Sequence, residues 1–324
     1  MGKSSLTQFA WLSIAAAVTT IGLKTGAYLL TGSVGLLSDA VESIVNLLGG
    51  LMALWMLTIA ARPADLKHTY GHSKAEYFAS GTEGFLILLA AASIAYTAVQ
   101  RLIHPQDLEK VGWGLGVSAT ASLINFLVAR VLLKAGRKNN SITLEADSAH
   151  LMTDVWTSLG VILAVFVVSI THWQIIDPVI ALIVAVNIIY TGVHLVGRSV
   201  SGLMDVALPP SEQKEIEGIL DKYRKKGIEF HALLTRQSAA RKFISVHILV
   251  PGDVTVHDGH HIAEEFEHDI LDLFNNAVVM THLEPIEDEI SSDDILLDRE
   301  RIERKLLLDS EISSGILGKM KKSK

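Results

Sequence analysis

The chain has 324 residues, of which 49% are apolar and 19% charged, and its formal net charge at pH 7 is −7. It contains no cysteine, which excludes disulfides and thiolate metal sites, so a metal would have to bind His, Asp, Glu or Asn. Residues 1–200 carry 12 Lys and Arg against 11 Asp and Glu, whereas residues 201–324 carry 16 against 24, an acidic balance that argues against a nucleic-acid partner.

Six segments are apolar and long enough to cross a bilayer, which takes about 20 mainly apolar residues in a helix. The first runs on into a second span and lacks a strongly basic start, so it is not a cleaved signal peptide. The sequence therefore predicts an all-α six-helix transmembrane domain within residues 1–207. The spans are expected at 9–31, 36–60, 78–101, 112–134, 143–170 and 177–198.

The loops of the predicted domain differ in charge. Lys and Arg gather between the second and third spans and between the fourth and fifth, while the turns near residues 31–35 and 171–176 hold neither. Short basic loops usually stay in the cytoplasm. We therefore expect a multi-pass protein surrounded by lipid in the inner (plasma) membrane, with both termini cytoplasmic.

The pattern changes after Pro209-Pro210 to that of a small soluble domain. Helical spacing and strand-like alternation follow each other in the order α-β-β-α-β. This order predicts a cytoplasmic α+β domain at residues 208–290. Residues 291–324 form a charged tail, which is either an amphipathic helix or a solvated, partly disordered segment. The expected helices lie at 211–226 and 256–274, and the expected strands at 229–237, 242–250 and 277–283.

Two predicted spans carry matching polar groups, Glu42 and Asn46 in the second and His150 and Asp154 in the fifth. Each pair is four residues apart and so lies on one helix face. A charge near the bilayer centre costs at least ~2.5 kcal/mol, so such residues usually have a function. Two such faces would offer four O and N ligands to a tetrahedral divalent metal. For Asn46 taken alone, a hydrogen bond to a neighbouring helix is the favoured interpretation.

Asp65, His68 and His72 form a second group in the loop after the second span. Their spacing, D-x2-H-x3-H, would bring two imidazoles and a carboxylate to one side of a short turn. These groups suit zinc, although the motif by itself is a weak signal.

The C-terminal domain holds seven of the thirteen histidines. His231, His247 and His282 lie on or beside separate strands, and for them metal binding is the favoured interpretation. A rival set follows one stripe of the second helix, for which a solvated polar face is favoured instead. That stripe consists of His257, His261, Glu264 and His268.

Over nearly the whole chain, to about Asp288, the sequence resembles the cation diffusion facilitator family. The likeness lies in TGSVGLLSDA, HTYGHSKAE, ADSAHLMTDVWTS and LMDVALP, and in HALLTRQSAARKFISVHILV and VVMTHLEP of the last domain. It implies a homodimeric transporter that exports divalent metal, commonly zinc, in exchange for protons. It also implies a metallochaperone-like fold for the C-terminal domain, with bacterial zinc and iron exporters as the nearest relatives.

The resemblance further implies where the metal sites lie. The family's transport site falls on Glu42, Asn46, His150 and Asp154, with Glu42 where the family has Asp or His and Asn46 where it has Asp. A second site falls on Asp65, His68 and His72. A regulatory binuclear site that senses metal falls on His231, His247, His260, His282 and Glu284, the last in place of Asp. Lys74 and Asp205 match a structural charge pair of the family.

Together these features predict a secondary active transporter rather than an enzyme. Its substrate and regulatory ligand would be Zn²⁺, or Fe²⁺, Mn²⁺, Co²⁺ or Cd²⁺, with H⁺ as the counter-ion. The alternative is a metal-binding membrane scaffold or sensor without transport, which the neutral amide of Asn46 would suit. An intramembrane hydrolase is disfavoured, because the motif around His150 lacks the adjacent glutamate of HExxH.

Overall fold

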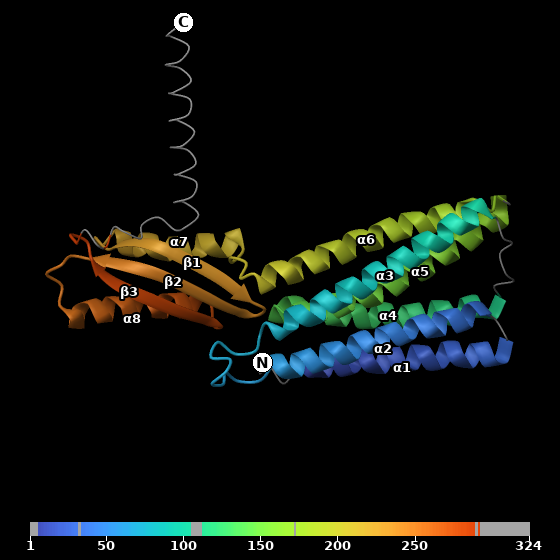
Figure 1. Cartoon of the computed structure of the whole chain (residues 1–324), viewed down its shortest axis with the longest axis horizontal. Helices are drawn as coiled ribbons and strands as arrows, with labels where there is room; N and C mark the ends of the chain where they lie inside the picture. The colour runs from blue at the N-terminus through green and yellow to red at the C-terminus, as the bar shows by residue number, and fades with distance from the viewer. Residues whose placement is uncertain (1–5, 32–33, 105–111, 172, 289–290, 292–324) are drawn as a thin grey trace, which may run out of the picture. The chain divides into compact units, whose positions relative to one another are not determined.

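The computed structural model describes residues 6–31, 34–104, 112–171, 173–288 and 291. Its chain divides into two compact units, one made of Met1–Asp205 with Ser238–Ala240 and the other of Val206–Gln237 with Arg241–Lys324. The first unit is all-α and the second is α+β (Figure 1), which confirms the predicted fold class. The helix predicted as one option for the tail lies outside the described residues.

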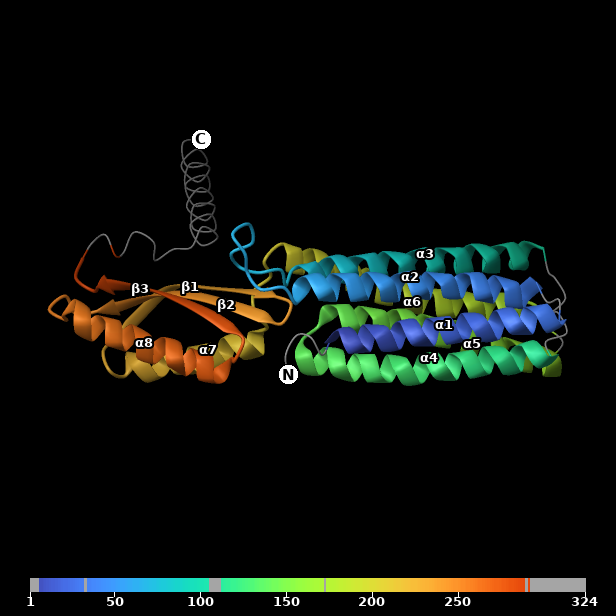
Figure 2. The same ribbon diagram turned by 90° about the horizontal axis from the view of Figure 1, so that it is seen from below.

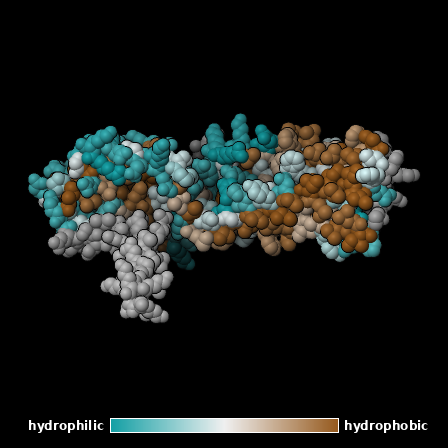
Figure 3. Space-filling view, turned by 90° about the horizontal axis from the view of Figure 1, so that it is seen from above, coloured by the Kyte–Doolittle hydropathy of each residue, from teal (hydrophilic) through white to brown (hydrophobic). Residues whose placement is uncertain are grey.

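Six long helices build the first unit, and each carries a stretch apolar enough to cross a membrane. At about 1.5 Å per residue, all are long enough to span an apolar layer about 30 Å thick. Large hydrophobic side chains such as Trp11, Phe85 and Tyr190 are exposed, and brown, hydrophobic surface covers much of this unit in Figure 3. The helices are α1 (Leu6–Thr31), α2 (Val34–Ala60), α3 (Ala75–Ile103), α4 (Gly112–Asn139), α5 (Ile142–Thr171) and α6 (Ile176–Leu203).

Helix α5 occupies the centre of the bundle, because it contacts each of the other five helices. Helices α3 and α6 make the most extensive contact of the bundle, and glycines lie within it. A Cβ added at Gly84 would lie 2.8 Å from Val196, and one added at Gly192 would lie 2.8 Å from Leu88. Small residues of this kind let membrane helices pack closely. Because α5 contacts all five other helices, a polar side chain on α5 can meet partners from several of them.

The second unit follows the predicted order α-β-β-α-β. Its three strands form one sheet in the order β1-β2-β3, and β2 pairs with β3 in parallel. Parallel neighbours need a long crossover connection, which α8 supplies. Each element ends within two residues of its predicted boundary. The elements are α7 (Pro210–Arg224), β1 (Glu229–Ser238), β2 (Arg241–Val250), α8 (Val256–Leu273) and β3 (Ala277–Pro285).

The two faces of this sheet have different surroundings. Ile244 and Ile248 of β2 are buried in a core with Phe266 of α8, and both helices lie on that side of the sheet (Figure 2). Successive side chains of a strand point to opposite faces. His247 therefore points away from the helices, and in the parallel register it is paired with His282 of β3. The face without helices is where polar side chains of the three strands meet.

Candidate metal centres

A cluster of polar side chains lies buried inside the helix bundle. Its members come from four helices, and none is more than 8% exposed. A buried polar group without a partner costs about 1–3 kcal/mol, so the contacts among these groups define the site. The cluster consists of Asn46 on α2, Glu83 on α3, Asn125 on α4, and Asp147, His150 and Asp154 on α5.

The carboxylate of Asp154 joins three helices. Its Oδ2 accepts a short hydrogen bond from Asn46 Nδ2 on α2 and a second one, of 3.0 Å, from Asn125 Nδ2 on α4. The amide oxygens of both asparagines are buried and have no hydrogen-bond partner among the described residues. Orphaned buried oxygens are uncommon in folded proteins, and a cation would satisfy them. The structure thus brings Asn46 and Asp154 together and adds Asn125 to them.

His150 contacts a carboxylate on a different helix. Its Nδ1 lies 2.7 Å from Oε2 of Glu83 on α3, which is the length of a hydrogen bond, although the ring N–H does not point along it. The side chain of Glu83 is fully buried. Its carboxylate lies against Gly49 of α2, where an added Cβ would be only 2.5 Å from Oε1.

Glu83 and Asn125 are members of the cluster that our sequence analysis missed. For Glu83 a signal was present, because an acidic residue inside a predicted span is a functional candidate by default. It also shares the buried stripe of α3 with Ser80 and Ile87, at helical spacing. Asn125 is an isolated amide in α4, and we find no sequence signal that would have singled it out.

Two further acidic residues, Glu42 and Asp147, lie one helical turn before the residues just described. Glu42 lies on α2, one turn before Asn46, but its side chain is outside the described part of the chain, so its ligand role stays a prediction. Asp147 lies one turn before His150 and accepts a hydrogen bond of 2.9 Å from the hydroxyl of Ser13 on α1. That bond ties α1 to α5 beside the site.

The loop between α2 and α3 brings Asp65, His68 and His72 together. Nδ1 of His68 lies 3.2 Å from Oδ1 of Asp65, and Nε2 of His72 lies 3.4 Å from Oδ2 of the same carboxylate. Gly71 makes the turn between the histidines with a φ of 84°, a value that favours glycine. One ligand atom from each of the three side chains lies within 4.8 Å of the others, a spacing that a single metal ion can bridge.

Backbone contacts also prepare the loop carboxylate for a cation. The backbone N–H groups of His68 and Lys67 donate to Oδ1 of Asp65 at 2.7 and 2.9 Å. The bond from His68 is the main cause that holds the pKa of Asp65 below its ordinary value. Asp65 therefore keeps its negative charge in mildly acidic solution.

Lys74 and Asp205 form an ion pair with an Nζ–Oδ1 distance of 2.9 Å. Lys74 also donates to the backbone carbonyl of Leu203, at the end of α6. Both contacts link the N-terminal end of α3 to the C-terminal end of α6.

The open face of the sheet carries a histidine cluster around Glu284 of β3. His231 of β1 places Nε2 2.8 Å from Oε2 of that carboxylate. On its other oxygen, Oε1, His282 Nε2 lies at 3.3 Å and His247 Nδ1 at 3.4 Å. Ligand atoms of His231, His247 and Glu284 lie within 4.8 Å of one another. We refer to these four residues as the sheet cluster.

His260 is not brought into the sheet cluster in this structure. It lies on α8, it is exposed, and its Nε2 is 4.0 Å from Glu264. The rival stripe on the same helix is also exposed, with the rings of His257 and His261 4.6 Å apart and His268 beside Asp272. Among the described residues, only the loop group and the sheet cluster bring three His, Asp or Glu ligand atoms within 4.8 Å of one another.

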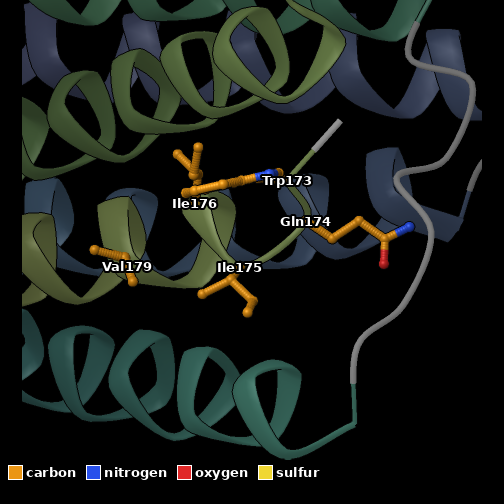
Figure 4. A pocket seen from close by; sticks show the side chains of 5 residues that line it. All are labelled: Trp173, Gln174, Ile175, Ile176 and Val179. Carbon is orange, nitrogen blue, oxygen red and sulfur yellow. The ribbon is translucent and has the colours of Figure 1, made fainter. Parts of the chain in front are cut away.

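An apolar pocket of about 520 Å³ opens at the start of α6 (Figure 4). It is lined by Trp173, Gln174, Ile175, Ile176 and Val179. Gln174 is its only side chain that can offer an oxygen to a metal, and it carries no charge. The pocket is therefore not a metal site.

Comparisons with known proteins cover both units. Residues 10–204 match the family model described as the cation efflux transmembrane domain. Residues 208–286 match the model described as the cytoplasmic domain of cation efflux proteins.

Curated relatives match the chain over most of its length. The uncharacterized transporter sll1263 of Synechocystis sp. is 50% identical over 280 residues, which is 86% of this chain and 90% of the relative. The cation-efflux pump FieF of Salmonella arizonae is 31% identical over 272 residues, or 84% of this chain and 90% of the relative. Among solved structures, a chain of a candidate zinc transporter, CzrB, is 33% identical over 24% of this chain and 96% of that one, with a TM-score of 0.23.

Proposed function

The chain belongs to the cation efflux family, the cation diffusion facilitators, and from this premise we propose that it exports a divalent transition metal in exchange for protons. Zinc is the first candidate, and iron, manganese, cobalt and cadmium are the others. The observation that carries the proposal is the contact between Asn46 of α2 and Asp154 of α5 in the buried centre of the bundle. It joins the two helices from which the resemblance draws the transport ligands.

The chemistry of the cluster supports a transition metal as the cargo. Asp154 offers carboxylate oxygens and His150 an imidazole, while the unpartnered amide oxygen of Asn46 is a weaker ligand beside them. Mixed N and O ligands suit zinc, iron and manganese. Because all three side chains are at most 8% exposed, a bound ion would exchange its hydration shell for these groups.

Proton exchange follows from competition for the same ligands. Metal ligands must be deprotonated, so metal binding releases protons. An unperturbed imidazole titrates near pH ~6.5, which suits such competition at physiological pH. In the proposed cycle, metal from the cytoplasm displaces protons from His150 and the carboxylates, the helices rock, and protons from the other side release the metal. This is alternating access around a fixed site near the bilayer midplane.

The loop group and the sheet cluster are proposed as further metal sites of a homodimer. The sheet cluster is assigned a sensing role, because it lies in a domain that cannot itself carry an ion through the membrane. The basic loops support a cytoplasmic location for both sites and both termini in a plasma-membrane protein. His260 would have to approach the sheet cluster when metal binds, because in this structure it pairs with Glu264 instead.

One observation favours the second candidate function, a metal-binding scaffold without transport. Asn46 and Asn125 both turn an amide N–H towards Asp154, so that its Oδ2 is satisfied without a metal. A scaffold would bind metal at the loop group and the sheet cluster and move none.

Transport in liposomes separates the two functions. The purified full-length protein would be reconstituted, a pH gradient imposed, and uptake of zinc, iron, manganese, cobalt and cadmium measured together with proton release. The proposal expects zinc uptake that depends on the gradient and is accompanied by proton movement in the opposite direction. Metal binding in detergent without any uptake into liposomes would instead establish the scaffold.

A further inference from the structure

The proposed transport site lacks a carboxylate at Asn46, and the structure places one nearby on another helix. Glu83 of α3 is fully buried, and its Oε2 lies 2.7 Å from Nδ1 of His150. We propose that Glu83 is a positioning residue of the transport site, which orients His150 for the metal and supplies the negative charge that Asn46 does not. This inference rests on the proposed function and adds a third helix to its site.

The contact between the two side chains decides which ring nitrogen of His150 is available. A metal-bound histidine commonly gives its other ring N–H to a carboxylate, which fixes the tautomer and the ring orientation. In this structure Nδ1 lies beside Glu83 without an aligned hydrogen bond. A turn of the ring would align the Nδ1–H with Oε2 of Glu83 and leave Nε2 for the metal. Helix α3 would then support the ligand His150 through Glu83, while α2 and α5 carry the ligands themselves.

The bundle also has a space shaped for this carboxylate. Gly49 of α2 lies one turn beyond Asn46, and a Cβ there would lie 2.5 and 2.9 Å from the two oxygens of Glu83. Cβ atoms do not approach other atoms so closely, so only glycine leaves room at this position. Helix α2 thus places Asn46 against Asp154, and at Gly49 it leaves room for the carboxylate of Glu83.

A second buried glutamate on the same face of α3, Glu76, makes an ordinary structural hydrogen bond instead. Glu76 lies two turns before Glu83 and is 5% exposed. Its Oε2 accepts a hydrogen bond of 2.5 Å from the hydroxyl of Ser141, the residue directly before α5. The oxygens of Glu83, by contrast, have no well-aligned hydrogen bond within the described part of the chain and face an imidazole. Glu76 is therefore the matched control.

The test compares zinc uptake kinetics in proteoliposomes, normalised to the amount of folded dimer. Glu83→Gln keeps the shape and removes the charge, and it is expected to raise the KM for zinc by about tenfold or more, as losses behind a metal ligand do. Glu76→Gln should leave that KM unchanged, whatever it does to the yield of folded protein. Adding Asn46→Asp to Glu83→Gln should bring the KM back towards the wild-type value, because it restores the missing charge.

A second variant keeps the test valid if Glu83→Gln fails to fold. Gly49→Ala retains the charge but pushes the carboxylate away from its place, so it should raise the KM for zinc as well. Its control is Gly116→Ala on α4, where an added Cβ meets no atom of the described residues within 4 Å.

The outcomes separate this inference from the function on which it rests. A wild-type protein that moves no metal would overturn the proposed function. A transporting wild type, with Glu83→Gln and Glu76→Gln both at the wild-type KM, would overturn only the role of Glu83. A raised KM in Glu83→Gln that Asn46→Asp leaves uncorrected would overturn the charge argument.

Discussion

The buried cluster in the helix bundle and the sheet cluster hold similar groups in different ways. In the bundle, each contact joins two helices: α2 to α5 through Asn46 and Asp154, and α3 to α5 through Glu83 and His150. In the sheet, His247 and His282 face each other because β2 and β3 are hydrogen-bonded in a fixed register. Helices packed through side chains can shift against each other more easily than paired strands can.

This difference fits the two roles proposed for the sites. A transport site must change its surroundings to release an ion, and contacts between separate helices allow that. A sensing site must be ready before the ion arrives, and a backbone register provides this order.

Replacing Asp154 by Ala should abolish transport while leaving a folded dimer. The substitution removes a proposed ligand and also the acceptor of both asparagine amides. Zinc uptake by proteoliposomes measures the effect, and size-exclusion chromatography measures the dimer. Asp177→Ala on α6, which removes a carboxylate paired with Arg101 outside the cluster, is the control and should keep transport. Uptake retained by purified Asp154→Ala protein would exclude the assignment.

Asn46→Asp should tighten the binding of every divalent metal, by about tenfold for zinc, because it adds a negative charge at a ligand position and so favours the metal-bound state. It should also raise the proton demand for release. Iron and manganese accept weaker oxygen ligands than zinc does, so replacing the amide by a carboxylate should sharpen the discrimination against these two metals. Titrations of zinc and manganese into wild type and variant, with the loop group and the sheet cluster disabled, provide the measurement. If Asn46→Asp leaves the affinity for zinc and the affinity for manganese both unchanged from wild type, Asn46 is a packing residue rather than a ligand.

Replacing His231, His247 and His282 together by Ala should weaken metal-dependent compaction of the C-terminal domain and spare basal transport. The sheet cluster would lose three of its four groups, while the buried cluster is untouched. Small-angle scattering with and without zinc would report compaction. The control removes the three exposed histidines of α8, His257, His261 and His268, and should preserve the response. Complete loss of transport in a triple variant that is still dimeric would contradict the sensing role.

Asp65→Asn should weaken zinc binding at the loop group by a few-fold at pH 7, because it removes a negatively charged oxygen ligand. The backbone N–H of His68 keeps the pKa of Asp65 below its ordinary value, so the wild-type carboxylate is ionised at this pH. Calorimetry on protein that lacks the other two sites would measure the affinity. A zinc affinity that Asp65→Asn leaves unchanged would mean that Asp65 is not a ligand.

The fold was largely predictable because its signals are local. Apolar runs of membrane length gave six spans, and the change of period after Pro210 gave the order α-β-β-α-β, with small differences in the boundaries. The grouping of Asp65 with His68 and His72 was also local, since all three lie within eight residues of one loop. The place of Glu42 in the site remains a prediction.

The face of a helix or strand on which each polar residue lies was predictable from the sequence, because it follows from the periods of 3.6 and 2. Which faces meet depends on the tertiary packing. It placed Glu83 against His150, turned Asn125 towards Asp154, and left His260 with Glu264. Those contacts depend on how helices cross, and at Gly49 on a side chain that is absent, so no periodicity along one element can reveal them.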